Sequence, residues 1–329
     1  MKYADVASSL YSYLFPFETP LPSKITIIPD GVLNDIPFGT LVTETMPRGT
    51  AYDDLPYALH NYTFSYAPSW GGLWGMQQRK SNGTKKLVAF GPAFYKSDSI
   101  KKMPLLNPFK YTGEELRAIE RRWPGAQIYT NSYATKKRFK QEAEYYKIIH
   151  LSTHGISNKE DVDSSFIAFT SIDGYPYTPM YYQEVALQSL NADLVYLSAC
   201  ETGLGEFYAG EGVFSIARAF ITAGSKSVVM TPWSVDERAT LEITMQFYQN
   251  LKAGLPKDIA LSKAKQLYIN ETKQVDSAHP YFWAGLMPIG DMSPVDIAPA
   301  LFPSSAWLWL LALIGAIFLL LAVYRYIKR

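Results

Sequence analysis

The sequence predicts an α/β fold of three layers, in which a mostly parallel central sheet is flanked by helices. Short apolar or β-branched runs recur between Lys24 and Gly290, and amphipathic segments separate most of them. The runs are almost continuously hydrophobic, which is typical of strands covered on both faces. Because strands and helices alternate, crossover connections and parallel pairing are favoured. A chain of 329 residues is long enough to bury a large core.

Nine segments are expected to be strands, because each is short, apolar and bounded by residues that favour turns. In chain order they are Lys24–Pro29, Thr63–Pro68, Lys86–Gly91, Gln127–Thr130, Lys147–Ser152, Ser165–Thr170, Asp193–Ala199, Ser227–Trp233 and Gly285–Gly290.

Five segments are expected to be helices, because their apolar residues recur at helical spacing. They are Gly113–Trp123, Ala134–Tyr146, Gly210–Gly224, Val235–Gly254 and Pro256–Glu271. Asp236 is a candidate N-cap and Pro256 suits a first helical turn, whereas Gly224 and Gly254 suit helix ends. The segments Glu44–Pro56 and Ser69–Lys86 are expected to be loops, the second because it is rich in glycine and tryptophan.

Composition and missing motifs exclude several classes of function. The net charge is +1 with 19% charged residues, so no basic excess points to nucleic acid. The glycine-rich stretch Gly203–Gly212 lacks both the GK[ST] ending and the GxGxxG spacing of nucleotide loops. The sequence contains no HExxH motif and no cysteine cluster, which would suggest a metal site, and no GxSxG motif, which would suggest a serine hydrolase. We therefore expect neither a cofactor nor a metal.

The single cysteine, Cys200, follows one predicted strand, and His154 follows another. In parallel sheets, ligands bind at the carboxyl ends of the strands, so the two residues could share one crevice. A thiol with a pKa near 8.5 is only roughly 3% thiolate at neutral pH, and an imidazole can remove its proton. The backbone N–H groups of Gly155 and Cys200 could stabilise an oxyanion. From the spacing alone, an inert thiol at a strand end remains an alternative.

The segments around these two residues resemble the CHAT domain, a caspase-like cysteine peptidase family related to separases and caspases. The resemblance is carried by "HLSTHG" and by "LSACETGLGEFYAGEGVFSIARAFITAGSKSVVMTPWSVDERAT", with further similar blocks such as "ITIIPDGVLNDIPFGTLV" and "HPYFWAGLMPIGD". It implies a caspase-like fold over residues 1–291, with a pseudo-caspase-like part at 1–110 and the catalytic part at 111–291. It also implies His154 as the general base and Cys200 as the nucleophile.

The same resemblance makes the segment Thr231–Glu237 a wall of the substrate cleft. We expect Trp233, Ser234, Asp236 and Glu206 to contact substrate, and the acidic residues of these loops to favour lysine or arginine before the scissile bond. Asp236 could equally serve only as a helix cap. The other histidines, His60, His150 and His279, are expected to be structural, since metal ligands spaced like His150 and His154 belong on helices.

The C-terminal part is predicted to cross a membrane. The segment Ala306–Tyr324, "AWLWLLALIGAIFLLLAVY", has no charged residue and would extend roughly 28 Å as a helix. We expect a linker at 292–304, a transmembrane helix at 305–324 and a basic tail at 325–329. The tail favours a cytoplasmic C-terminus, yet the N-terminus resembles no signal peptide. The domain is therefore either tail-anchored in the cytoplasm or the end of a longer exported protein.

These features predict a membrane-attached, regulated cysteine endopeptidase of bacterial type that cleaves a protein substrate, for instance a gasdermin-like pore former. The family's frequent fusion to tetratricopeptide repeats suggests such a repeat as a regulator. The alternative is a catalytically silent scaffold that binds proteins at the membrane. The presence of both His154 and Cys200 argues against that alternative.

Overall fold

The computed structural model describes residues 3–17, 19, 21–94, 106, 109–158, 161–198, 212–233, 235–272 and 275–297, with only the backbone of 212–215 and 275–276. By its internal contacts the chain divides after Val295, and every described helix and strand lies in the first unit. None of the described helices is long and apolar enough to cross a bilayer. The predicted transmembrane segment 305–324 lies outside the described residues.

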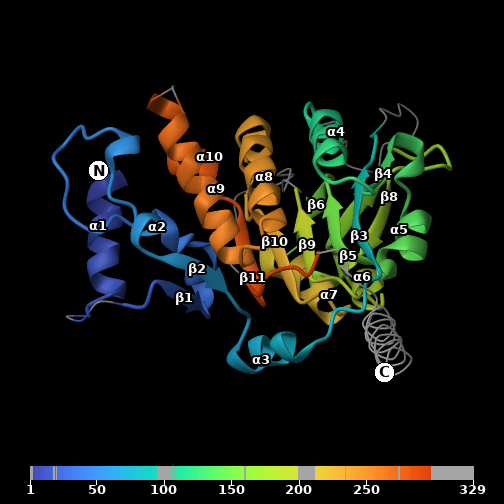
Figure 1. Cartoon of the computed structure of the whole chain (residues 1–329), viewed down its shortest axis with the longest axis horizontal. Helices are drawn as coiled ribbons and strands as arrows, with labels where there is room; N and C mark the ends of the chain where they lie inside the picture. Colours follow the sequence, from blue (N-terminus) through green and yellow to red (C-terminus); the bar gives the residue numbers. More distant parts are fainter. Residues whose placement is uncertain are drawn as a thin grey trace, which may run out of the picture. The chain divides into compact units, whose positions relative to one another are not determined.

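An eight-stranded sheet forms the centre of the first unit, in the order β1-β2-β11-β10-β9-β5-β3-β4 (Figure 1). Its strands are β1 (Lys24–Ile27), β2 (Thr63–Tyr66), β3 (Lys85–Gly91), β4 (Gln127–Thr130), β5 (Tyr146–Leu151), β9 (Leu194–Leu197), β10 (Ser227–Met230) and β11 (Met287–Gly290). All pairs are parallel except β10 with β11. The prediction of a mostly parallel central sheet is confirmed.

A second, antiparallel sheet contains β6 (Gly155–Ile156), β7 (Phe166–Phe169) and β8 (Thr178–Tyr181), in that order. Only β7 was expected from the sequence. β8 contains Pro179, whose missing N–H weakens a strand signal but is tolerated in an edge strand. This small sheet begins directly after β5, so it continues the chain from the carboxyl edge of the central sheet.

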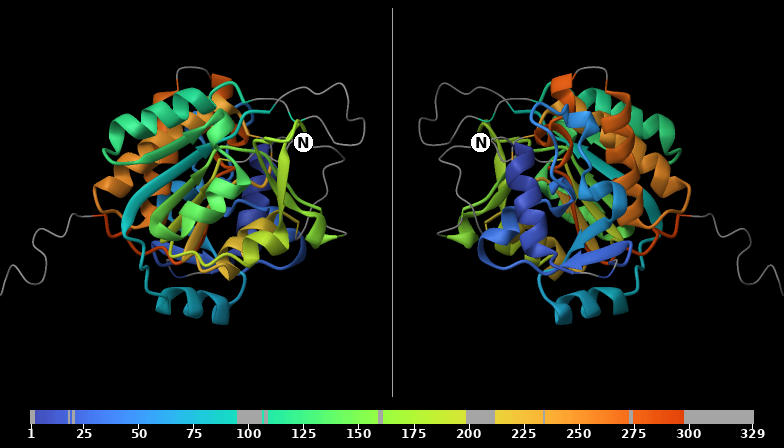
Figure 2. Two further views of the ribbon diagram at one scale, coloured as in Figure 1. Left: turned by 90° about the vertical axis from the view of Figure 1, so that its right-hand side faces the viewer. Right: turned by 90° about the vertical axis from the view of Figure 1, so that its left-hand side faces the viewer.

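Ten α-helices are described. They are α1 (Tyr3–Leu14), α2 (Ala58–Asn61), α3 (Trp70–Gln78), α4 (Thr112–Arg122), α5 (Lys136–Glu142), α6 (Tyr182–Ala186), α7 (Gly212–Thr222), α8 (Glu237–Lys252), α9 (Lys257–Glu271) and α10 (Pro280–Trp283). Helices α4, α8 and α9 cover one face of the central sheet, and α1 and α7 lie on the other (Figure 2). The predicted three-layered architecture is therefore confirmed.

Helix α3 corrects the expectation of a loop over Ser69–Lys86. Three of its nine residues are glycines, which disfavour a helix. The helix nevertheless starts at a cap, because the Ser69 hydroxyl accepts a hydrogen bond from the Gly72 N–H at 3.0 Å. It buries Leu73 and Met76 against the rest of the domain, and this tertiary packing outweighs the weak local preference.

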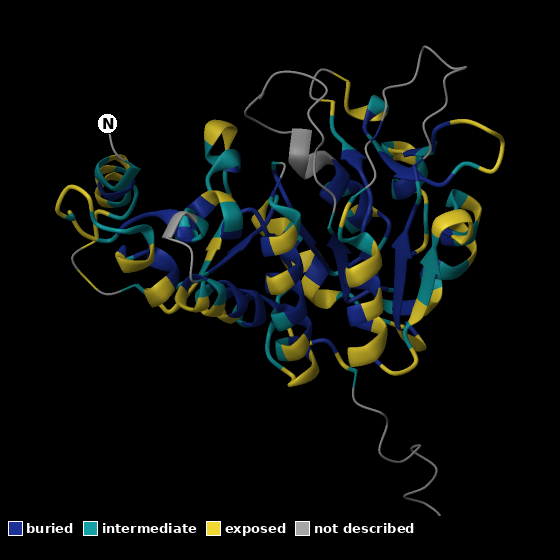
Figure 3. Cartoon of the chain, turned by 90° about the horizontal axis from the view of Figure 1, so that it is seen from above, coloured by how far each residue is buried: buried dark blue, intermediate teal, exposed yellow. Residues whose placement is uncertain are grey.

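The main hydrophobic core lies between the sheet and the layer that contains α1 and α7. Large buried rings from distant elements meet there, including Phe38, Phe64, Phe90, Phe139 and Phe220. Figure 3 shows the buried strands inside, with exposed residues on the outward faces of the helices. Burial of this size is the dominant force that holds the layers together.

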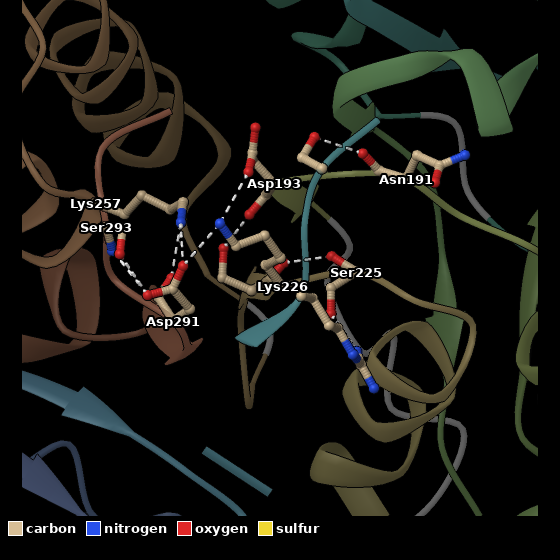
Figure 4. Close-up of polar contacts among 10 residues, drawn as sticks. Asn191, Asp193, Ser225, Lys226, Lys257, Asp291 and Ser293 are labelled. Atoms are coloured by element: carbon tan, nitrogen blue, oxygen red, sulfur yellow. Dashed lines mark hydrogen bonds and ion pairs between the residues drawn. The ribbon is translucent and has the colours of Figure 1, made fainter. Parts of the chain in front are cut away.

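Charged groups are clustered at the amino edge of strands β9 and β10 (Figure 4). Lys226 Nζ lies 3.3 Å from the Asp193 carboxylate and 3.2 Å from that of Asp291, and Lys257 Nζ donates to the Asp291 carbonyl at 2.7 Å. Burial lowers the pKa of Lys226, but the two carboxylates outweigh this and raise it. Burial lowers the pKa of Lys257 to about 8, despite the neighbouring Asp291. The cluster links the starts of β9 and β10 to the end of β11.

Candidate active site

The carboxyl ends of β5 and β9 carry the predicted catalytic residues. These strands are parallel neighbours, and their register pairs Leu151 with Leu197. His154 follows Leu151 by three residues, and Cys200 follows Leu197 by three residues. Adjacent strands lie about 4.8 Å apart, so β5 and β9 end side by side at this edge. Cys200 itself lies outside the described residues, as do Glu206 and Ser234.

Both the backbone and the imidazole ring of His154 contact neighbouring residues. Its carbonyl accepts a hydrogen bond from the Ala168 N–H at 2.9 Å, which ties it to β7. Its ring stacks on Phe109 with centroids 4.1 Å apart and also contacts Phe94 at 4.8 Å. Only 1% of the residue is exposed. The imidazole is thus ordered and covered by two aromatic rings.

Gly155 is the first residue of β6 and pairs with Ile167 of β7. Its backbone is therefore fixed next to His154 by the second sheet. The role of its N–H in an oxyanion hole stays a prediction, as does the role of the Cys200 N–H.

The connection from β10 to α8 contains the predicted substrate-binding residues Trp233 and Asp236. The Asp236 carboxylate accepts a hydrogen bond from the Ala239 N–H at 2.8 Å and so caps α8, as the sequence suggested. The Trp233 Nε1 atom is buried and has no hydrogen-bond partner among the described residues. Gly285 packs closely against this connection, because an added Cβ at Gly285 would lie only 2.4 Å from Val235 Cγ1.

A small, open pocket lies at the same edge of the sheet. Its lining comes from the first turns of α4 and α8, the segments before them, and the ends of β5 and β9. These residues are Phe109, Tyr111, Thr112, Glu115, Ser152, Ser198, Val235, Glu237, Thr240 and Leu241. Neither Trp233 nor Asp236 is among them. Glu115 could not be selected from the sequence, because an acid in a first helical turn is usually explained by the helix dipole.

Glu115 joins a small polar network at the base of this pocket. Ser152 Oγ donates to Glu115 Oε2 at 2.8 Å and lies 3.1 Å from the Thr112 hydroxyl. The other carboxylate oxygen, Oε1, lies 3.5 Å from His150 Nε2, which is long for a charge-assisted hydrogen bond. The Glu237 Oε2 atom accepts the Tyr111 N–H at 3.1 Å, which joins the two helix starts.

The remaining histidines lie inside the central sheet or at helices α2 and α10. His150 is a fully buried residue of β5, stacks on Tyr196 and lies 3.0 Å from the Tyr248 hydroxyl. His279 caps α10 through Nδ1, which accepts from the Tyr281 N–H. His60 is an exposed residue of α2. In the part of the chain that the structure describes, no cluster of three or more potential ligands could hold a metal ion.

Comparisons with known proteins agree with this architecture. The sequence model of the CHAT domain matches residues 4–291. Tetratricopeptide repeat protein 28 of Homo sapiens is 28% identical over 201 residues, which cover 50% of this chain and 8% of the relative. The chain thus spans less than a tenth of that protein's length.

Two solved structures align with most of this chain. The Arg-specific cysteine proteinase gingipain R aligns over 89% of this chain and 68% of its own, with 10% identity and a TM-score of 0.51. This likeness shows the caspase-like α/β fold. The Saccharomyces cerevisiae separase–securin complex aligns over 78% of this chain and 14% of the matched chain, with 12% identity and a TM-score of 0.47.

Proposed function

Because this chain belongs to the CHAT domain family, we propose that it is a cysteine endopeptidase that uses Cys200 and His154 as a catalytic dyad. The observation that supports this most directly is the register of β5 and β9, in which both residues follow paired leucines by the same number of positions. The caspase-like fold supports the same reaction class.

In the proposed mechanism, the His154 imidazole removes the proton from the Cys200 thiol, and the thiolate attacks the carbonyl carbon of the scissile peptide bond. The N–H groups of Gly155 and Cys200 stabilise the resulting oxyanion. The imidazolium then donates its proton to the departing amine, and a thioester between substrate and Cys200 remains. A water molecule, deprotonated by His154, hydrolyses the thioester and releases the acid product.

The proposal extends to attachment and regulation. The charge-free segment within 305–324 supports a single membrane span. The similarity to a tetratricopeptide repeat protein supports such a repeat, in the same or another chain, as the regulator of the peptidase. Its substrate is a protein, with gasdermin-like pore formers as one candidate.

The test is covalent labelling of the full chain by peptidyl chloromethylketones, followed by mass spectrometry of the Cys200 peptide. We expect rapid labelling that collapses in His154→Ala and is kept in His60→Ala, a matched histidine variant on the exposed surface of α2. Equal, slow labelling of all three proteins would refute an activated thiol and favour the scaffold alternative.

Membrane attachment is tested separately by alkaline carbonate extraction of cell membranes. The full chain should stay in the membrane pellet, and the double substitution Ile314→Arg and Ile317→Arg should release it, because two charges at the centre of a span oppose insertion. Release of the unchanged chain by carbonate would contradict the membrane span.

A further inference from the structure

Helix α3 presents two exposed tryptophans to its surroundings. Trp70 is 72% exposed and Trp74 is 60% exposed, and because they are four positions apart they share one face of the helix. The opposite face buries Leu73 and Met76. Figures 1 and 2 show α3 projecting from the lower side of the first unit. Tryptophan is buried on average, so an exposed pair on one helix face indicates a binding surface.

Helix α3 lies at the amino edge of the central sheet. Arg79, which follows the helix, donates to the carbonyl of Ser225 at 2.8 Å, just before β10. The Ser81 hydroxyl donates to the carbonyl of Asn191 at 2.8 Å, shortly before β9. His154, in contrast, follows the carboxyl end of β5, and β5, β9 and β10 are parallel. The exposed tryptophans and the predicted dyad therefore belong to opposite edges of the sheet.

The chain leaves the central sheet at this same amino edge. Strand β11 is antiparallel to β10, and its last residue, Gly290, pairs with Ser227, the first residue of β10. Helix α3 packs against that point, because an added Cβ at Gly290 would lie only 2.9 Å from Met76 Sδ. The chain beyond the first unit, residues 296–304, can extend at most about 32 Å. A bilayer that holds the segment 305–324 therefore keeps the first unit close to its surface.

The sequence around α3 is basic. Between Ser69 and Lys86 it has four lysines and arginines and no aspartate or glutamate. Lys80 and Lys86 are exposed, whereas Lys85 lies 3.6 Å from the Glu142 carboxylate. Indole rings accumulate where lipid meets water, and lysines near a membrane surface are attracted to anionic headgroups. Exposed indoles beside exposed lysines thus match the chemistry of an anionic bilayer surface.

We propose that α3 lies on the lipid surface of the membrane that anchors the C-terminus. Trp70 and Trp74 insert among the headgroups, and Lys80 and Lys86 contact anionic lipids. The inference rests on the proposed membrane attachment and adds a second contact to it. Because α3 lies at the amino edge, this contact turns the carboxyl edge, and with it His154, away from the bilayer. The predicted dyad then faces water, where it meets substrate segments that are not buried in lipid.

The test uses the full chain with a fluorescent label on α3. Cys200→Ser removes the only native thiol, and Gln78→Cys introduces one on the exposed face, four positions after Trp74. The thiol carries the fluorophore NBD, and the protein is reconstituted into vesicles of phosphatidylcholine with or without phosphatidylserine. Iodide on both sides of the membrane quenches a label that water reaches. The matched control carries its label at Tyr133→Cys, a position 68% exposed just beyond the carboxyl end of β4.

We expect the label at position 78 to be shielded from iodide and the label at position 133 to be quenched. The double substitution Trp70→Gln and Trp74→Gln should abolish the shielding, and because both side chains are exposed it removes no buried packing. The double substitution Lys80→Gln and Lys86→Gln should weaken the shielding only in vesicles that contain phosphatidylserine, since neutral lipid offers no anionic headgroup.

The outcomes separate the surface contact from the membrane span. If alkaline carbonate releases the chain, the proposed span fails and this inference fails with it. If the chain resists carbonate but both labels are quenched alike, or the shielding survives the loss of both tryptophans, the contact of α3 with lipid alone is overturned. Shielding that increases with the amount of protein per lipid would identify a second copy of the chain as the partner and would overturn it too. None of these results depends on peptidase activity.

Discussion

The buried side chain of Lys265 stabilises the backbone next to Val235, and its titration should make the stability of the domain depend on pH. Its ammonium donates to the carbonyls of Leu286 at 2.6 Å and Ala284 at 3.3 Å. These residues flank Gly285, which packs against Val235 of the pocket lining. Burial lowers the pKa of Lys265 from 10.5 to about 7. Lys265 thus binds the backbone on either side of Gly285, although its burial disfavours the protonated form of its side chain.

The magnitude follows from the pKa change. Each pKa unit corresponds to 1.36 kcal/mol, so protonated Lys265 lowers the free energy of unfolding by up to about 5 kcal/mol. Because the folded pKa is the lower one, the unfolded chain binds more protons between pH 7 and 10.5, and stability rises with pH in that window. From about pH 7.5 to about pH 9.5 the gain from this one group is roughly 2–3 kcal/mol.

The assay is urea unfolding of the full chain at several pH values, compared with the variant Lys265→Met. Methionine leaves the two carbonyls without a donor, which shifts stability equally at every pH. The change with pH in the difference between the two proteins therefore reports the titration of Lys265. We expect the natural protein to gain on the variant as the pH rises. Lys263→Met, an exposed lysine on the same helix, should show no such trend. A pH-independent difference for Lys265→Met would refute the reasoning.

Three further substitutions test the site. Asp236→Ala should lower the free energy of unfolding by about 1 kcal/mol through loss of the α8 cap, and Asp236→Asn should keep it, because asparagine caps a helix equally well. Urea unfolding measures both, and equal stability of Asp236→Ala and the natural protein would contradict the role of the cap. Gly285→Ala should lower the free energy of unfolding by about 1–3 kcal/mol, because the added Cβ would overlap Val235. Urea unfolding measures this change, and an unchanged midpoint would contradict the close packing. Phe109→Ala should expose the His154 ring and speed the labelling of Cys200 by bulky peptidyl probes relative to iodoacetamide; equal rates would show that Phe109 does not restrict access.

Much of the central sheet could be predicted from sequence because its strands are short, apolar and bounded by turn residues. All nine predicted segments contain strands, and Gln127–Thr130 matches β4 at both ends. The two-residue strand β6 and the proline-containing β8 gave no such signal. The antiparallel direction of β11 was not visible either, since hydrophobicity does not encode strand direction.

The candidate site could be predicted only in part. His154 and Gly155 were identifiable because they follow an apolar strand within a recognisable motif. Glu115 was not, because its neighbours in the pocket come from elements far apart in sequence. Only the strand order β10-β9-β5-β3 brings the starts of α4 and α8 together over the ends of β5 and β9.

Both edges of the central sheet hold buried ionisable groups that lie against partners from other elements. At the amino edge, Lys226 lies between the carboxylates of Asp193 and Asp291. At the carboxyl edge, Glu115 Oε2 accepts a hydrogen bond from the Ser152 hydroxyl, and its Oε1 faces His150 Nε2 at 3.5 Å. A buried charge without a partner is costly, so breaking either set should destabilise the domain by more than the loss of an exposed ion pair would. The ends of the strands are therefore fixed by pairs that join elements far apart in the sequence.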